Sequence, residues 1–197
     1  MHPNLISLML FCFVTSCTPG PNNILASYSS FNFGIKKTFP HMIGVALGYT
    51  SMITILDIGL ILPFKKYPII QDVLKVLGSF FLIYLAYKIS FSKSSSGNLI
   101  NNPVKFLESY FFQFINPKGV VTAIIVVSQF IDTGENFIQD TIVVFTLTLT
   151  SAFLSISTWA IFGKYLRSLL SSKLSISLFN YSMASLLVLI VVLFWIK

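Results

Sequence analysis

Six apolar stretches separated by short polar segments account for most of the 197-residue sequence. A transmembrane α-helix needs roughly 20 mostly apolar residues, and it satisfies its backbone hydrogen bonds within itself. The stretches of about that length or longer are Leu5–Phe33, Met42–Leu62, Ile69–Phe91, Phe106–Phe130, Thr141–Phe162 and Leu178–Ile196. We therefore predict an all-α membrane protein with six transmembrane helices in a single polytopic domain, residues 1–197.

Charged residues make up only 10% of the chain, whereas an average soluble domain has about 25%. This argues against a soluble enzyme, a nucleic-acid-binding protein and a disordered chain. The net charge of +7 instead reports orientation, because cytoplasmic loops are enriched in Lys and Arg. Eight basic residues fall on one side of the six spans (Lys36, Lys37, Lys88, Lys93, Lys105, Lys164, Arg167 and Lys173) and four on the other (Lys65, Lys66, Lys75 and Lys197), which predicts periplasmic termini.

Two of the stretches are interrupted at matching places. The segments Thr18-Pro19-Gly20 and Asn116-Pro117-Lys118 lie 98 positions apart, half the chain length. Three helices per half is an odd number, so a repeated half must insert upside down. Inverted repeats with interrupted helices are typical of secondary transporters. We predict a first repeat over residues 1–98 and an inverted second over 101–197, although a proline kink alone is common in membrane helices.

The interruptions predict helix ends inside the membrane. Pro19 and Pro21 lack a backbone N–H, and Gly20 permits a sharp turn. Asn22 and Asn23 could cap a half-helix beginning there, as could Asn116, with Pro117 at the first helical position. The exposed N–H groups of such a helix start attract a carboxylate. We predict a substrate site at Pro19, Gly20, Pro21, Asn22, Asn116, Pro117 and Lys118.

Lys118 and Asp57 are ionisable residues inside these stretches. The cost of burying Lys118 predicts a water-filled cavity or an acid beside it, with snorkelling to an interface as the alternative. Asp57 shares a helix face with Thr50 and Thr54, which makes it a candidate for coupling transport to protons. The alternative is that Asp57 simply lies near a helix end, since Pro63 follows.

Small and hydroxyl-bearing residues form two further patterns. Gly44 and Gly48 suit a close helix contact. Thr148, Ser151, Ser155 and Thr158 share one face of the fifth stretch, where they serve either helix packing or the lining of a substrate path.

Enzyme signatures are absent from the sequence. It has no G-x-x-x-x-G-K-[ST], H-E-x-x-H or G-x-G-x-x-G motif. The two histidines, His2 and His41, are too few and too separated for a convincing metal site. We predict neither enzymatic activity nor a cofactor.

Several of these segments resemble the lysine exporter (LysE/RhtB) family of bacterial amino-acid exporters. They are TPGPNN at 18–23, followed by Gly34, Gly44, Gly48 and Gly59, then LKVLGSFFLIYLAYK at 74–88, FLESYFFQFINPKGVV at 106–121 and SQF at 128–130. The resemblance implies a six-helix exporter of the bacterial inner membrane, driven by exchange with protons. It places Pro19 to Asn22 in the family's first motif and Asn116 to Lys118 in its second.

Two departures from the family pattern bear on the substrate. Tyr49 stands where exporters of basic amino acids often have an acid, and Ala86 replaces a glycine usual in the third helix. The first departure favours neutral, threonine- or homoserine-like amino acids over basic ones. The expected partners are a small amino acid, protons and lipid, with no nucleic acid, and homo-oligomerisation is left open. The alternatives are a cation exporter of the wider superfamily and a non-transporting membrane protein.

Overall fold

The computed structural model describes residues 5–90, 103–131 and 136–196, and every element in these ranges is helical. In chain order the elements are α1 (Leu5–Cys17), α2 (Pro21–Phe33), α3 (Ile35–Ile55), the π-helical turn η1 (Leu56–Leu60), α4 (Ile61–Lys66), α5 (Ile69–Ser90), α6 (Phe106–Ile115), α7 (Pro117–Phe130), α8 (Phe137–Leu169) and α9 (Lys173–Trp195). The predicted all-α class is confirmed.

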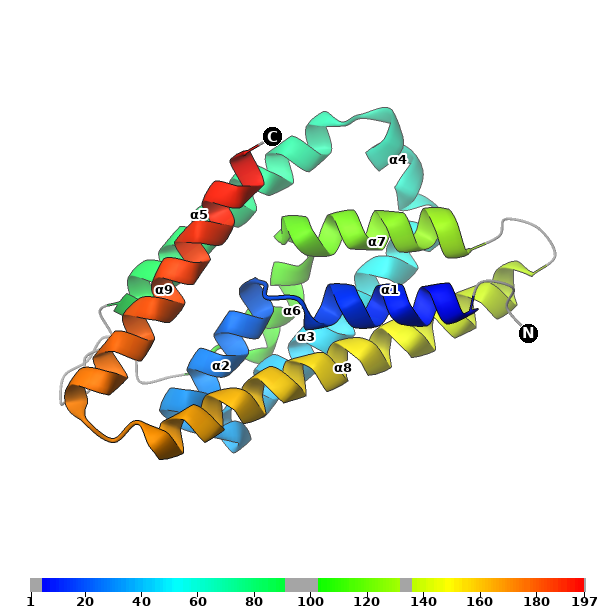
Figure 1. Ribbon diagram of the computed structural model, residues 1–197. Helices are drawn as coiled ribbons and strands as arrows, with labels where there is room; N and C mark the ends of the chain where they lie inside the picture. The colour runs from blue at the N-terminus through cyan, green and yellow to red at the C-terminus, as the bar shows by residue number, and fades with distance from the viewer. Residues whose placement is uncertain (1–4, 91–102, 132–135, 197) are drawn as a thin grey trace.

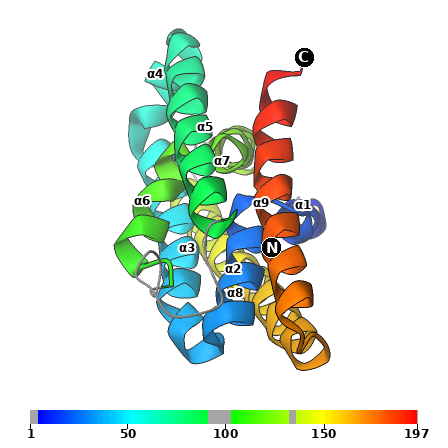
Figure 2. The same cartoon turned by 90° about the vertical axis from the view of Figure 1, so that its left-hand side faces the viewer.

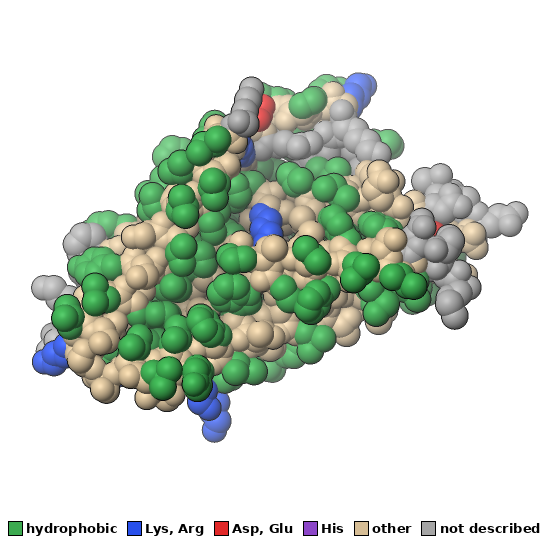
Figure 3. All heavy atoms as spheres, in the orientation of Figure 1, with side chains coloured by type: hydrophobic (Ala, Val, Ile, Leu, Met, Phe, Trp, Pro, Cys, Tyr) green, Lys and Arg blue, Asp and Glu red, His purple; other side chains and the backbone are tan. Residues whose placement is uncertain are grey.

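Four helical segments are long and apolar enough to cross a membrane, namely Ile35–Gly59, Asp72–Ser90, Phe137–Leu169 and Lys173–Trp195. The pairs α1/α2 and α6/α7 pass the same test together, with bends of 53° and 65°. Counting each bent pair as one span gives six. The outer surface is largely apolar in the view of Figure 3, as a lipid-facing surface should be.

Parts of the predicted organisation fall outside the described residues. These are the junction between the predicted repeats at 98–101, His2, and two of the basic residues used for the orientation, Lys93 and Lys197. The inverted-repeat arrangement and the periplasmic position of the termini stay predictions.

The second span begins earlier than expected. The predicted stretch starts at Met42, but α3 begins at Ile35 and contains Pro40. Gly34, with φ of 83°, turns the chain from α2 directly into α3, and only this left-handed conformation permits so short a connection. Pro40 is tolerated near the helix start, where it is exposed and its missing N–H costs one hydrogen bond.

The far end of this span and the length of α8 also differ from the prediction. Regular helix stops at Ile55 and continues as η1, where Gly59 has φ of 134°, so Pro63 lies in α4 rather than at a helix boundary. The fifth span runs over Phe137–Leu169 instead of Thr141–Phe162. Its 33 residues correspond to about 50 Å, well beyond the roughly 30 Å hydrocarbon core.

Two apolar clusters hold the helices together. One joins α2, α5, α6 and α9 and includes Ile24, Leu82, Phe112 and Leu187. The other joins α1, α3, α7 and α8 and includes Leu8, Ile53, Val126 and Val144. Figures 1 and 2 show α5 and α9 running together along one flank, with α1 beside α8 on another. Each bent span therefore has one half in each cluster.

Glycines allow the closest approach between helices. A Cβ atom added at Gly44 would lie 2.5 Å from the carbonyl oxygen of Phe106, and one at Gly48 would lie 2.5 Å from that of Tyr110. Both contacts join α3 to α6, so the predicted role of this glycine pair in close helix packing is confirmed.

Candidate functional site

The two bent spans break at the centre of the molecule and meet there (Figure 1). In the first, three residues separate α1 from α2, and in the second only Asn116 separates α6 from α7. The Nζ atom of Lys118 donates to the carbonyl oxygen of Thr18 at 2.9 Å and to its Oγ1 at 2.8 Å. Lys118 therefore joins the start of α7 to the end of α1.

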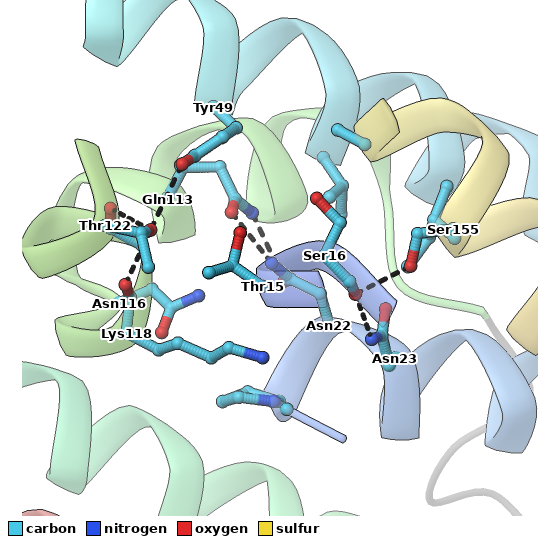
Figure 4. A pocket seen from close by; sticks show the side chains of 16 residues that line it. Thr15, Ser16, Asn22, Asn23, Tyr49, Gln113, Asn116, Lys118, Thr122 and Ser155 are labelled. Atoms are coloured by element: carbon cyan, nitrogen blue, oxygen red, sulfur yellow. Dashed lines mark hydrogen bonds between the residues drawn. The ribbon is translucent and has the colours of Figure 1, made fainter. Parts of the chain in front are cut away.

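A cavity of about 520 Å³, including its open mouth, lies between the breaks (Figure 4). Of the predicted site residues, Gly20, Pro21, Asn22, Asn116 and Lys118 line it, whereas Pro19 and Pro117 do not. The other lining residues are Thr15, Ser16, Asn23, Val45, Tyr49, Gln113, Gly119, Thr122, Ala152, Ser155 and Ile156.

Both half-helices begin at the cavity with proline as their first residue and without a side-chain cap. The first N–H groups of a helix have no intrahelical acceptor. In α2 these belong to Asn22 and Asn23, and in α7 to Lys118 and Gly119. All four residues line the cavity. Together with the Lys118 ammonium group, the two helix starts make this region attractive to an anion such as a carboxylate.

The asparagines of the first break do not cap α2, contrary to the prediction. The capping position precedes the helix, and it is taken by Gly20, because the helix already starts at Pro21. The Asn22 side chain instead pairs with Gln113: its Nδ2 donates to Oε1 at 2.8 Å, and Gln113 Nε2 donates to its Oδ1 at 3.2 Å. Figure 4 shows these two side chains facing each other across the cavity wall.

Asn116 occupies the capping position of α7, as predicted, but its side chain makes no capping hydrogen bond. The residue is 3% exposed, and within the described part of the chain its Oδ1 has no hydrogen-bond partner. A buried acceptor without a donor carries a substantial desolvation cost. Asn116 thus offers the cavity a hydrogen-bond acceptor that an ammonium group could satisfy.

The carbonyl end of α1 is, in contrast, well supplied with donors. Asn23 Nδ2 donates to the carbonyls of Ser16 at 2.8 Å and Thr18 at 3.0 Å. From α8, Ser155 Oγ donates to Ser16 at 2.7 Å and Trp159 Nε1 to Cys17 at 3.3 Å. These bonds satisfy carbonyl groups that a helix end leaves without partners.

Lys118 packs directly over the first break. A Cβ atom at Gly20 would lie 3.1 Å from its Nζ, closer than normal contacts allow, so glycine makes room for the ammonium group. Its side chain is half-buried and reaches across the cavity in Figure 4. Lys118 thus lines a cavity, as one of the two alternatives for this residue expected.

Asp57 lies away from the cavity. Its Oδ2 accepts a hydrogen bond from Thr141 Oγ1 at 2.8 Å. Thr141 and the cavity residue Ser155 are 14 positions apart on α8, about 21 Å along the axis. The π-helical turn also shifts Asp57 out of the α-helical register that would align it with Thr50. The structure therefore does not bring Asp57 to the other predicted site residues.

The hydroxyl residues of the fifth span have different surroundings. Ser155 lines the cavity, Thr148 is buried and donates to the carbonyl of Val144, and Thr158 is exposed. Ser155 also donates to the carbonyl of Ser16 and so joins α8 to α1, whereas the Thr148 bond stays within α8. A role for this face in lining a substrate path stays a prediction.

Several lining residues were not among the predicted site residues, including Thr15, Gln113, Thr122 and Tyr49. The Tyr49 hydroxyl donates to Thr122 Oγ1 at 3.1 Å. Gln113 carried a usable signal, because it is an uncharged polar residue in an apolar run, one helical turn before Asn116. Among the described residues no three His, Cys, Asp or Glu side chains are placed to hold a metal ion.

Comparisons with known proteins identify related sequences. The model of the LysE type translocator family matches residues 13–197. A cysteine/O-acetylserine efflux protein of Klebsiella pneumoniae subsp. pneumoniae is 32% identical over 135 residues, which cover 66% of this chain and 67% of the relative. The protein of the same description from Escherichia coli (strain K12) is 29% identical over 133 residues, or 66% and 68% of the two chains. No solved structure matches significantly.

Proposed function

The chain belongs to the LysE type translocator family, and on that premise we propose that it exports small neutral amino acids across the bacterial inner membrane in exchange for protons. The substrate class is that of threonine and homoserine, and it extends to cysteine and O-acetylserine, which name the relatives' cargo. It excludes lysine and arginine.

The observation that carries this proposal is the meeting of two uncapped helix starts in one cavity. The N–H groups of Asn22, Asn23, Lys118 and Gly119, together with the Lys118 ammonium group, provide for the substrate carboxylate. The free Oδ1 of Asn116 provides for its amino group. An amino-acid zwitterion carries its carboxylate and its amino group close together. It could therefore contact the helix starts and Asn116 Oδ1 within one cavity.

The side-chain preference is argued from what lines the cavity. The lining residues include hydroxyl and amide groups but no Asp or Glu. A second positive charge on the substrate would therefore be desolvated without a counter-ion. The same lack of carboxylates gives no support to the alternative of a cation exporter.

The proposed mode of transport rests on two inverted repeats. The supporting features are the bent spans of the two halves, each with proline at the start of its second half-helix. In secondary transporters of this kind, one repeat moves relative to the other around a fixed site. We place both termini in the periplasm on the basis of the distribution of Lys and Arg.

Counterflow in proteoliposomes tests the proposal. Vesicles containing the purified protein and unlabelled L-threonine should take up radiolabelled L-threonine or O-acetyl-L-serine at equal internal and external pH. Unlabelled L-lysine in the lumen should not support this uptake. Equal exchange of lysine would refute the assigned substrate class, and no exchange of any amino acid would refute export.

The Asn22–Gln113 amide pair has a matched control on the same helix. Asn32 Nδ2 of α2 donates to Asn180 Oδ1 of α9 at 2.9 Å, and neither residue lines the cavity. Asn22→Ala should abolish counterflow while leaving the amount of protein in the membrane unchanged, whereas Asn32→Ala should preserve counterflow. If both variants exchange normally, the site assignment is wrong.

A further inference from the structure

One part of the cavity wall is aliphatic, in contrast to the polar helix starts. It consists of Val45 on α3 and of Ala152 and Ile156 on α8, and we call these three residues the aliphatic wall. Positions 152 and 156 are four apart, so the two α8 residues share one face of that helix. The contacts proposed for the substrate carboxylate and amino group do not involve the aliphatic wall, so its role in binding is still to be assigned.

The aliphatic wall is supported from behind by a buried cluster. Val45 and Ile156 pack in this cluster with Ala26 of α2, Met42 of α3 and Ala160 of α8. The three supporting residues are at most 4% exposed. Because protein interiors are close-packed, a wall with this support cannot recede for a larger ligand without repacking the cluster. The side chains that line the cavity therefore set the size of the group that fits there.

The polar side of the cavity also has a fixed position. Asn22 is held from behind by His41, whose Nε2 lies 3.3 Å from the Asn22 carbonyl oxygen, while Nδ1 of the same ring lies 2.6 Å from Ser109 Oγ on α6. Figure 4 shows Asn116 on the opposite side of the cavity from Ser155 of α8. The substituents of an amino-acid Cα diverge, so an amino group at Asn116 directs the side chain away from α7 and toward α8.

Ser155 adds a polar group next to the aliphatic wall. It precedes Ile156 on α8, lines the cavity, and donates its hydroxyl proton to the carbonyl of Ser16 at 2.7 Å. A hydroxyl oxygen that donates its proton can still accept hydrogen bonds. Aliphatic groups beside such an acceptor match a short side chain that carries carbon and a hydroxyl, as threonine and homoserine do.

We propose that the aliphatic wall is the subsite for the substrate side chain. Ala152 and Ile156 limit the length of that side chain, and Ser155 accepts a hydrogen bond from its hydroxyl. This rests on the proposed function and names the residues that select among neutral amino acids. A smaller residue at 156 lengthens the subsite, and a larger residue at 152 shortens it.

Ile156→Val tests the limit on length. It removes one methylene group from the wall, so L-leucine should compete better with L-threonine counterflow. The ratio of the inhibition constants of L-leucine and L-alanine should fall about 10-fold. Ile53→Val is the matched control, because Ile53 is 2% exposed, belongs to another apolar cluster and does not line the cavity. Its ratio should equal that of the wild type.

Ala152→Val tests the same limit in the opposite direction. The added methyl groups should weaken competition by L-threonine about 10-fold more than competition by L-alanine, whose side chain is a single methyl group. A fault in folding would affect both amino acids alike, so equal weakening would overturn the role of Ala152. Ile156→Val removes volume and remains decisive if Ala152→Val fails to reach the membrane.

Ser155→Ala tests the polar part of the subsite. L-Valine has the shape of L-threonine without the hydroxyl group, so the two amino acids form a matched pair of competitors. The preference for L-threonine over L-valine should fall about fivefold in the variant, as expected for one lost hydrogen bond. An unchanged preference would overturn the role of Ser155, since loss of its bond to Ser16 would affect both amino acids equally.

The wild-type assay separates this inference from the proposed function. If the wild type exchanges no amino acid, the proposed export is wrong and the subsite has no substrate. If the wild type exchanges L-threonine while Ile156→Val keeps the wild-type ratio of L-leucine to L-alanine, export stands and the side-chain subsite is overturned.

Discussion

The two helix breaks differ in how their polar groups are satisfied. At the first break, side chains from α2, α7 and α8 donate to the carbonyls of Ser16, Cys17 and Thr18. At the second, no described side chain donates to the last carbonyls of α6, and Asn116 Oδ1 is buried without a partner. The first break therefore has its carbonyl groups paired with side-chain donors, whereas the second keeps a buried acceptor that the proposed substrate could satisfy. Changes at the first should act on stability, and changes at the second on binding.

Beside the loss of counterflow expected for Asn22→Ala, the largest effect is expected at Lys118, the residue shared by both breaks. Lys118→Met removes the ammonium group and both hydrogen bonds to Thr18, and the initial export rate in proteoliposomes should fall about 100-fold or more. Lys164→Met, an exposed lysine on α8 away from the cavity, is the control and should export normally. Robust export by Lys118→Met would show that the breaks function without this link.

Two alanine variants should separate the contribution of the first break to stability from that of the second break to substrate binding. Asn116→Ala removes an unsatisfied buried acceptor, so we expect about a 10-fold higher KM and no loss of thermal stability. Asn23→Ala removes two hydrogen bonds to α1 and should lower the free energy of unfolding by about 1–2 kcal/mol with a smaller change in KM. Both variants should be measured by the midpoint of thermal unfolding and by transport kinetics. A loss of stability in Asn116→Ala together with a large rise in KM in Asn23→Ala would contradict the comparison.

A double-mutant cycle on Asn22 and Gln113 should give a smaller effect. The reciprocal hydrogen bonds predict a coupling free energy of about 1 kcal/mol in stability. The cycle on Asn32 and Asn180 should give a similar stability coupling without an effect on transport. If loss of the Asn32–Asn180 pair also abolished transport, transport would depend on every side-chain contact of α2. The Asn22–Gln113 pair at the cavity would then have no special role.

The smallest effect on substrate affinity is expected at Asp57. Because its contact is with Thr141, far along α8 from the cavity, Asp57→Asn should leave the KM within about twofold. Its role as a coupling residue stays a prediction, which gradient-driven accumulation by the same variant would examine. A large change in KM at equal pH would place Asp57 closer to the substrate than the structure does.

The membrane spans, the helix breaks and one close helix contact could be predicted from the sequence. Apolar length predicts the spans, proline and glycine predict the two breaks, and Gly44 and Gly48 predict close packing. The cost of a buried charge correctly predicts that Lys118 faces a cavity. Each of these features depends on the residues of one short segment, so it can be predicted without knowing the distant partners of that segment.

Features that depend on distant partners could not be predicted. Whether Asn22 caps a helix or lies inside it depends on one residue, since α2 starts at Pro21 and not later. The pairing of Asn22 with Gln113, 91 positions away, is visible only in three dimensions. Asp57 lies in a π-helical turn beyond the cavity and contacts Thr141, 84 positions away, which the sequence pattern does not reveal. His41 was considered only as a metal ligand, because its partners on α2 and α6 come from other parts of the chain.

The length of α8 has a mechanical consequence. The helix is uninterrupted from Phe137 to Leu169, and along it Thr141 holds Asp57 while Ser155 and Trp159 grip the end of α1. One continuous helix therefore links the Asp57 contact to the rim of the cavity, about 21 Å apart along the axis. A shift of α8 along its axis would move both contacts together.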